Sequence, residues 1–234
     1  MIRIYMKNNR RQFIATSALA SLSIPLMGMK ENILQDDTLS LPVLKPAALK
    51  AGDTIAISSP AGAVWDDSQV EKFVSIIENS GFQVKRGQTL KEKYGYFAGT
   101  DELRAKEIND FFSDKHVKAV FCMKGGWGCS RILEQLDYDV IKNNPKIIMG
   151  FSDITALLIA ITSKTGLVTF HGPVGNSGWN DFTVGYVKRI LVEKELVAYS
   201  YPGEDTDKPY TITTGKVTGI LVGGNLTVVS CMIG

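Results

Sequence analysis

The stretch Ile147-Ile148-Met149-Gly150-Phe151-Ser152-Asp153-Ile154 carries the clearest structural signal in the chain. Three apolar residues lead to a glycine, and a helix-like run follows as far as Lys164, so the stretch predicts a buried strand that turns directly into a helix. Ser152 lies on that turn. A serine hydroxyl becomes an effective nucleophile only where a tight turn, backbone donors and a base surround it. The sequence therefore predicts the turn, but it does not identify the base.

The same order of strand and helix recurs along the chain. Several of the predicted helices carry apolar residues on one face or begin at a capping residue. Such alternation predicts a parallel sheet with helices on both faces, which is a doubly wound, Rossmann-like α/β domain. The predicted strands cover residues 53–58, 82–86, 117–123, 146–150 and 167–170, and the predicted helices cover residues 67–80, 100–112, 154–164 and 181–193.

The composition is that of an ordinary globular protein. Its 234 residues are 44% hydrophobic and supply a sizeable core, and 26 Lys and Arg nearly balance 24 Asp and Glu. No basic run with interleaved aromatic residues marks a nucleic-acid surface, so nucleic acid is not an expected partner. Cys122, Cys129 and Cys231 form no Cys-x-x-Cys pair and predict neither a disulfide framework nor a zinc site. We expect all three to be buried as small hydrophobic residues.

The first 28 residues predict an export signal that is not part of the fold. Arg10-Arg11 stands in a basic segment before a mildly apolar stretch from Ala15 to Met27, which is the order of a twin-arginine-like signal. Polar residues and a proline interrupt that stretch, and it is too short for a permanent membrane span. We expect an exported, periplasmic protein that starts at Met1 or Met6. A buried amphipathic helix is the alternative interpretation.

Changes in composition divide the remaining chain into four parts. Residues 29–45 are predicted to be a linker, and residues 46–175 form the α/β domain that bears the candidate nucleophile. Residues 176–205 hold the last predicted helix and an interdomain linker. Residues 206–234 include a segment that alternates Thr with apolar residues, as β structure does. We interpret this last part as the start of a second, β-rich domain that is truncated where the chain ends.

Three predicted strand ends bring glycine or polar residues to one edge of the sheet. They are Ser58-Ser59-Pro60-Ala61-Gly62, Lys124-Gly125-Gly126-Trp127-Gly128 and Phe151-Ser152-Asp153. Ligands of open parallel sheets bind beyond the carboxyl ends of the strands. The glycine-rich turn exposes backbone N–H groups, and the partial positive charge of a helix start at Ser152 favours an oxyanion. The combination predicts an acyl-transfer site, although a lone serine at a helix start is more often only a cap.

Motifs along residues 42–234 resemble the N-terminal portion of the LD-carboxypeptidases, the serine peptidases of family S66 that are also called muramoyltetrapeptide carboxypeptidases. The resemblance implies hydrolysis of the bond between a diamino acid and the terminal D-alanine of a peptidoglycan tetrapeptide, in cell-wall recycling or remodelling. The motifs are Ser58-Ser59-Pro60-Ala61-Gly62, Tyr96-Phe97-Ala98-Gly99-Thr100-Asp101-Glu102, Lys124-Gly125-Gly126-Trp127-Gly128 with Arg131-Ile132-Leu133, Gly150-Phe151-Ser152-Asp153-Ile154-Thr155-Ala156, Thr169-Phe170-His171-Gly172-Pro173 and Gly223-Gly224-Asn225-Leu226.

The resemblance also implies roles for individual residues. Ser152 matches the family's nucleophile, and the backbone N–H groups of Asp153 and Gly126 match its oxyanion hole. No metal or cofactor is implied. In the family a Glu and a His serve the serine, and both follow the Gly-Gly-Asn-Leu segment at positions beyond Gly234, so this chain by itself is expected to be inactive. The residues expected in the substrate pocket are Gly125, Trp127 and His171.

Two histidines, an arginine and two tryptophans have alternative interpretations. His116 precedes a predicted strand at the edge away from the site, which favours a solvated surface position. His171 follows a predicted strand, and we expect a positional role for it in preference to that of the base. Arg131 would bind a substrate carboxylate or form a structural ion pair, and its helical position favours the ion pair. Trp127 and Trp65 would line the cleft or cover apolar surface.

Three functional interpretations stay open. The first is the exported LD-carboxypeptidase, with a muropeptide as its partner and with the choice between monomer and homodimer undecided. The second is a related immunity peptidase that cleaves a peptide-nucleotide antibiotic by the same chemistry. The third is a non-catalytic peptide-binding module. A nucleotide cofactor ranks below all three, because the chain lacks the glycine fingerprint of dinucleotide-binding and phosphate-binding loops.

Overall fold

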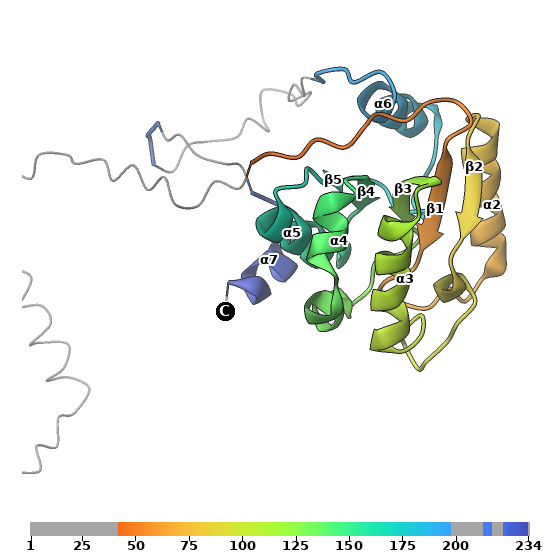
Figure 1. Ribbon diagram of the computed structural model, residues 1–234, viewed down its shortest axis with the longest axis horizontal. Helices are drawn as coiled ribbons and strands as arrows, with labels where there is room; N and C mark the ends of the chain where they lie inside the picture. The colour runs from red at the N-terminus through yellow and green to blue at the C-terminus, as the bar shows by residue number, and fades with distance from the viewer. Residues whose placement is uncertain (1–41, 198–212, 217–221, 234) are drawn as a thin grey trace, which may run out of the picture. The chain divides into compact units, whose positions relative to one another are not determined.

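The computed structural model describes residues 42–197, 213–216 and 222–233. These residues form a five-stranded sheet in the order β2-β1-β3-β4-β5, and every neighbouring pair of strands is parallel (Figure 1). The predicted doubly wound α/β fold is confirmed. The strands are β1 (Thr54–Ser58), β2 (Gln83–Arg86), β3 (Val117–Cys122), β4 (Ile147–Gly150) and β5 (Phe170–His171).

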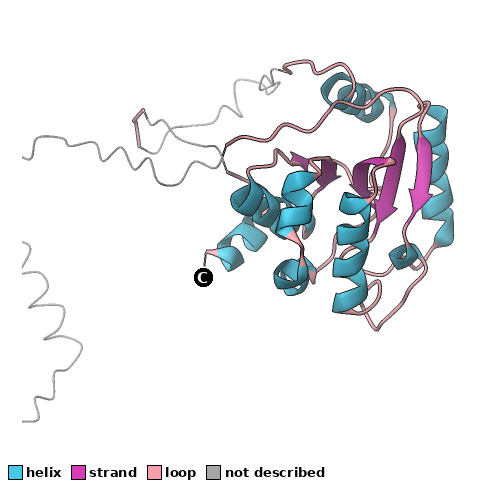
Figure 2. Ribbon diagram, in the orientation of Figure 1, coloured by secondary structure: helices cyan, strands magenta, loops and turns pink. Residues whose placement is uncertain are grey.

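Helices cover both faces of the sheet (Figure 2). The sequence dictates their starts, because side chains of Asp66, Thr100 and Asn180 accept hydrogen bonds from backbone N–H groups at the starts of α2, α3 and α6. No helix within the described ranges is both long and apolar enough to cross a membrane. The helices are α2 (Asp67–Asn79), α3 (Asp101–Ser113), α4 (Tyr138–Asn143), α5 (Ile154–Thr165), α6 (Asp181–Leu191) and α7 (Leu226–Met232), with the short 3-10 helices η1 (Gln88–Leu90) and η2 (Cys129–Gln135).

Alternate residues of the strands enter two separate cores. Ile55 and Ile57 of β1 pack on one face with residues of α2 and α6. Ala56, between them, packs on the other face with residues of α3, α4 and α5. This alternation follows from the two-residue repeat of a strand, and burial on both faces explains why the central strands β1, β3 and β4 are mostly apolar. The rigid double-sided core fixes the strand ends that carry the site.

The last strand differs from its prediction. Residues 167–170 were expected to form it, but β5 consists of Phe170–His171. Leu167 instead forms a parallel bridge with Leu44, and Thr162 Oγ1 donates to the Leu167 carbonyl at 2.9 Å. The backbone of Leu167 is therefore engaged elsewhere, and the strand starts three residues later. As a result His171 belongs to the strand and does not follow it.

Parts of the predicted domain division lie outside the described residues. These are the export signal (residues 1–28), most of the linker, and most of the alternating segment on which the β-rich domain was predicted. The described residues that follow form helix α7, which Asn225 caps by accepting a hydrogen bond from Val228 N. Val228 and Met232 pack against the core beneath α5.

Candidate functional site

The loops after β1 and β3 meet at the point where the strand order reverses. β2 lies on one side of β1, and β3, β4 and β5 lie on the other. Gly62 N donates to the Gly125 carbonyl at 3.3 Å, and Lys124 Nζ donates to the Ala63 carbonyl at 3.0 Å. Such a switch point is the usual ligand position in a doubly wound sheet. Two of the three predicted segments are therefore in direct contact there.

Ser152 joins β4 to α5 through a strained turn. Its φ is 62°, a left-handed conformation that residues with a Cβ rarely adopt. Strain of this kind costs about 1–3 kcal/mol and clusters at functional sites. The chain can turn this sharply because residue 150 is glycine, since a Cβ there would lie 2.8 Å from Ile154 Cγ2. The arrangement is the sharp strand-to-helix elbow that presents a nucleophile at the end of a sheet.

The glycine-rich turn packs directly against this elbow. A Cβ on Gly125 would lie 3.0 Å from Ser152 Cβ and 3.3 Å from Ser152 Oγ. Gly126 has a φ of 136°, and a Cβ there would lie 2.6 Å from the hydroxyl of Tyr96. A Cβ would thus be crowded at residue 125 and strained at residue 126, and with glycine at both places the backbone of the turn lies beside the serine. The predicted residues Ser152, Asp153, Gly125 and Gly126 are thus brought together.

Trp127 belongs to an exposed aromatic group beside the glycine-rich turn. Its ring stacks on Tyr96 with centroids 5.3 Å apart, and it meets Phe97 edge-on at 4.6 Å. Trp127 is 55% exposed and Tyr96 41% exposed, so both rings present apolar surface to solvent next to Gly126. Trp65 is also exposed, and Lys93 Nζ lies 5.4 Å from the centroid of its ring.

His171 lies near the elbow, where its ring contacts Phe151 and forms no hydrogen bond with Ser152. The two rings meet edge-on with centroids 6.4 Å apart, and partial burial lowers the pKa of His171 below 6.5. His171 also lines an apolar cleft of about 430 Å³ between β5 and α6. Within residues 42–197, 213–216 and 222–233, no hydrogen bond joins Ser152 Oγ to His171 or to any other side chain. His116 is exposed before β3, at the opposite edge, as predicted.

Arg131 forms a structural ion pair, as its helical position predicted. Its Nη2 lies 2.7 Å from Asp101 Oδ2, and its guanidinium also lies 5.3 Å from the Phe97 ring. The hydrogen bond from Arg131, assisted by the charge of Arg104, lowers the pKa of Asp101 below 3.8. The side chain is therefore already engaged and does not point to a free carboxylate-binding site.

Two buried charged residues of α3 were missed by the sequence reasoning. Arg104 is fully buried, and its Nη1 donates to the carbonyls of Pro60 at 2.6 Å and Gly128 at 3.1 Å. Glu107 accepts hydrogen bonds from Ser58 Oγ at 2.6 Å, from Thr89 Oγ1 at 2.6 Å and from Thr89 N at 3.0 Å. Both residues lie under the loops of the site. A signal existed, because Arg104 and Glu107 interrupt the apolar face that continues with Ile108 and Phe111.

The cysteines divide between core and surface. Cys122 and Cys129 are buried, and burial raises the pKa of each thiol far above 9.0. Cys231 on α7 is exposed, so the prediction that all three are buried was wrong for it. The apolar contacts of α7 are made by Val228 and Met232, whereas residue 231 faces away from them. No group of three potential metal ligands occurs within the described residues.

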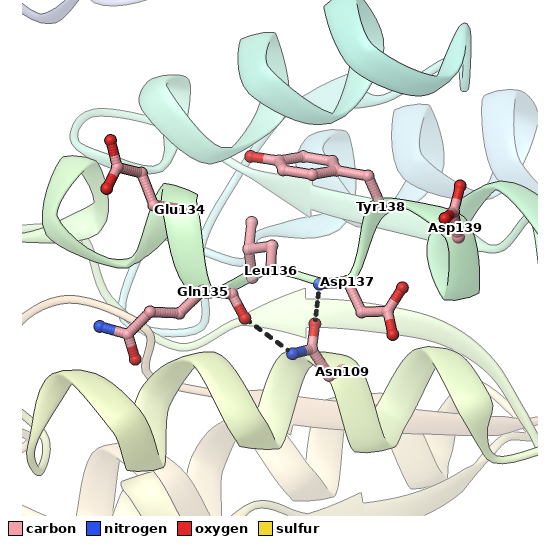
Figure 3. Close-up of a pocket in the computed structure, with 7 residues that line it drawn as sticks. All are labelled: Asn109, Glu134, Gln135, Leu136, Asp137, Tyr138 and Asp139. Carbon is pink, nitrogen blue, oxygen red and sulfur yellow. Dashed lines mark hydrogen bonds between the residues drawn. The ribbon is translucent and has the colours of Figure 1, made fainter.

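A second cavity, of about 570 Å³, lies away from these residues. Figure 3 shows Asn109 of α3 bridging to the segment between η2 and α4. Its Nδ2 donates to the Gln135 carbonyl at 3.0 Å, and its Oδ1 accepts from Asp137 N at 2.9 Å. These bonds tie the segment to α3. None of the predicted site residues lines this cavity, so it is not the candidate site.

Comparison with known proteins identifies relatives of the chain that carries this strand-end site. A family model described as the LD-carboxypeptidase N-terminal domain of peptidase S66 matches residues 55–172. A probable murein peptide carboxypeptidase of Bacillus subtilis is 38% identical over 195 residues, covering 81% of this chain and 60% of that protein. A murein tetrapeptide carboxypeptidase of Pseudomonas aeruginosa is 32% identical over 186 residues, covering 77% of this chain and 60% of that protein.

The name of a third relative indicates a different function. The microcin C7 self-immunity protein MccF of Escherichia coli is 32% identical over 212 residues, covering 78% of this chain and 62% of that protein. A solved structure of MccF without ligand matches with a TM-score of 0.70 and 29% identity, over 82% of this chain and 66% of that one. The chain thus spans 60–62% of the length of these three relatives. The match to the family model, which includes the elbow and the glycine-rich turn, shows that the chain belongs to the S66 family of LD-carboxypeptidases.

Proposed function

We propose that this chain carries the nucleophile of a serine-type LD-carboxypeptidase that releases the terminal D-alanine from peptidoglycan-derived tetrapeptides. The observation that carries the proposal is the left-handed Ser152 packed against the Gly125–Gly126 turn, in a chain of the S66 family. The names of the relatives from Bacillus subtilis and Pseudomonas aeruginosa support murein peptides as the substrate class.

In the proposed reaction Ser152 Oγ attacks the carbonyl carbon that precedes the terminal D-alanine. The carbonyl oxygen becomes an oxyanion, which accepts hydrogen bonds from the backbone N–H groups of Asp153 and Gly126. The general base that takes the proton from Ser152 Oγ passes it to the amide nitrogen. The C–N bond then breaks, D-alanine leaves with a free amino group, and the shortened peptide stays bound to Ser152 as an ester. A water molecule hydrolyses this ester and regenerates the serine hydroxyl.

The general base of this mechanism belongs to the part of the family's length that the chain does not match. By resemblance, a Glu and a His act there. His171 is a weaker choice, because its ring packs on Phe151 and no hydrogen bond in the described part of the chain joins it to Ser152. We therefore assign His171 to the wall of the pocket. On this proposal residues 1–234 alone do not turn over substrate.

Export to the periplasm is proposed together with this activity. Residues 1–28 support it through the arginine pair and the apolar stretch that follows. An exported enzyme would meet its peptidoglycan substrate outside the cytoplasm.

An immunity peptidase is the second candidate. It is favoured by the similarity to MccF, one solved structure of which holds aspartyl sulfamoyl adenosine. Both candidates use the same nucleophile and differ in the group beyond the scissile bond. The exposed Tyr96–Trp127 pair beside the turn fits an extended ligand in either case, so a comparison of the rates with the two substrates decides between the candidates.

The experiment compares the two substrates on the complete gene product. Purified protein is incubated with a muropeptide tetrapeptide or with aspartyl sulfamoyl adenosine, and the products are measured by mass spectrometry. We expect release of D-alanine and tripeptide with a kcat/KM at least about 100-fold above that for the nucleotide, a ratio that corresponds to about 2.7 kcal/mol of transition-state binding. Preferential cleavage of the nucleotide would replace the proposal with the immunity function.

A further inference from the structure

The peptide group between Gly128 and Cys129 is held on both sides by buried charged side chains. Its carbonyl oxygen accepts a hydrogen bond from Arg104 Nη1 at 3.1 Å. Its N–H donates to Asp153 Oδ2 at 2.8 Å. Arg104 is completely buried and Asp153 is 6% exposed, so neither contact is weakened by bulk water. This peptide group ends the glycine-rich turn that contacts Ser152.

The carboxylate of Asp153 does not cap its own helix. Asp153 is the residue before α5, where an aspartate normally accepts a hydrogen bond from the first turn, yet no such bond forms here. The side chain reaches across to Cys129, 24 residues earlier in the sequence. The residue that follows the nucleophile is thus tied through its side chain to the opposite wall of the site.

Arg104 fixes the same peptide group from α3. Its Nη1 also donates to the Pro60 carbonyl at 2.6 Å, and its Nη2 forms an ion pair with Asp101. The guanidinium lies 4.9 Å from the Phe97 ring. A Cβ on Gly128, whose φ is 125°, would lie 2.6 Å from the same ring, so the turn can approach Arg104 only with glycine at this place. Arg104 therefore joins the loops after β1 and β3.

We propose that the Asp153 carboxylate is the positioning group that holds the Gly125–Gly126 turn against Ser152. Arg104 acts with it from the other side of the Gly128–Cys129 peptide group. The inference rests on the proposed function for its effect on catalysis. The two donors of the oxyanion hole come from segments that are far apart in sequence, and their spacing must suit a single oxygen atom. The Asp153–Cys129 hydrogen bond links these two segments directly. Neither the Asp153 carboxylate nor Arg104 has to touch the substrate for this role.

The first test measures the turn itself. Hydrogen exchange of individual amides is followed by NMR in this chain and in its Asp153→Ala and Asp153→Asn variants, with Asp110→Asn as a control at an exposed aspartate. We expect exchange at Cys129, Gly126 and Gly125 to rise at least tenfold in Asp153→Ala and less in Asp153→Asn, whose amide oxygen can still accept. Amides of β3 and α5 should change little. Unchanged exchange at Cys129 in Asp153→Ala would overturn the inference.

The second test separates positioning from folding in the complete gene product, with tetrapeptide as substrate. We expect Asp153→Ala to lower kcat about 10- to 100-fold with KM changed less than about threefold, because displaced oxyanion donors act mainly in the transition state. Asp153→Asn should recover part of the loss, and Asp110→Asn should match wild type.

The outcomes of this second test are distinguishable from one another. A wild-type kcat in Asp153→Ala, together with an inactive Ser152→Ala variant, would overturn the positioning role alone. An active Ser152→Ala variant would overturn the proposed function. If Asp153→Ala does not fold, Asp153→Asn and Arg104→Lys carry the test, and each is expected to lower kcat with KM nearly unchanged. Wild-type kcat in both would contradict the inference.

Discussion

At Ser152 the backbone and the side chain have opposite requirements. The left-handed φ of 62° suits glycine, whereas the proposed chemistry requires a hydroxyl. Close packing around the elbow maintains this strain, because a Cβ would lie 2.8 Å from Ile154 Cγ2 at residue 150 and 3.0 Å from Ser152 Cβ at residue 125. The strained backbone of Ser152 thus lowers the free energy of unfolding of the protein, as is common at functional sites.

We predict that Ser152→Gly is more stable than Ser152→Ala. Both variants lack the hydroxyl, but only alanine keeps a Cβ in the left-handed region. Glycine removes strain of about 1–2 kcal/mol and loses part of that gain to its larger unfolded-state entropy, so we expect a net difference of about 0.5–1 kcal/mol. Urea unfolding of the two variants measures it. A less stable Ser152→Gly would show that the turn is not strained.

Contacts between residues that are far apart in sequence are the part of the site that the sequence could not predict. The sequence predicts Ser152 and the glycine-rich turn as parts of the site, because a serine at a strand end and a glycine-rich turn are local patterns. The roles of Arg104 and the Asp153 carboxylate depend on contacts with Gly128 and Cys129 across the sheet edge. No local pattern predicts such contacts, because they depend on strand order.

At the scale of elements, the link between β2 and α3 is electrostatic. Lys85 Nζ of β2 lies 2.6 Å from Asp114 Oδ2, and Asp114 follows the last residue of α3. The hydrogen bond from Lys85, followed by the one from His116 N, lowers the pKa of Asp114 from 3.8 to about 2. Because the folded pKa is the lower one, this contribution to stability is present above pH 3.8 and is lost as the pH falls toward 2.

We predict that Asp114→Asn reduces stability at neutral pH and that the loss is much smaller near pH 2. The expected loss at pH 7 is about 0.5–1 kcal/mol, because Lys85 is half exposed and solvent weakens the pair. The difference from wild type should shrink between pH 3.8 and 2, where the native carboxylate becomes protonated. Urea unfolding at several pH values measures it, with Asp110→Asn as the matched control. A difference in stability between wild type and Asp114→Asn that does not change with pH would contradict the stabilising role of the Lys85–Asp114 pair.

The elements themselves were predicted well wherever local signals were complete. Helix α2 follows a capping Asp66, and β3 is an apolar run that only Lys118 interrupts, so their bounds agree with the prediction to within one residue. The error at β5 has another cause, because the backbone of Leu167 pairs with Leu44, more than 120 residues away. Hydrophobic patterns do not identify such a pairing partner.

At the scale of the whole molecule, the segment after the α/β domain is attached at the nucleophile helix. Asn225 N donates to Thr155 Oγ1 at 3.0 Å, and a Cβ on Gly224 would collide with the side chain of Thr155. Thr155 lies in the first turn of α5, three residues after Ser152. The Gly-Gly-Asn-Leu motif is therefore positioned by the same helix that carries the elbow.

We predict that Thr155→Val loosens α7 without disturbing the sheet. The lost hydrogen bond contributes about 0.5–1.5 kcal/mol, so amides of residues 228–232 should exchange about 2- to 10-fold faster. Hydrogen exchange with mass spectrometry measures this change. Thr162→Val is the control, because Thr162 lies on the same helix as Thr155 but donates to the Leu167 carbonyl and not to α7. Equal protection of α7 in both variants would argue against the link.

Ser152 is proposed here to be the nucleophile of a carboxypeptidase. The most direct measurement is the rate of D-alanine release from a muropeptide tetrapeptide by the complete gene product and by its Ser152→Ala variant, with both shown to be folded. Loss of the nucleophile is expected to lower kcat by at least about 1,000-fold, with KM little changed. Release of D-alanine at equal rates by the two proteins would contradict the account.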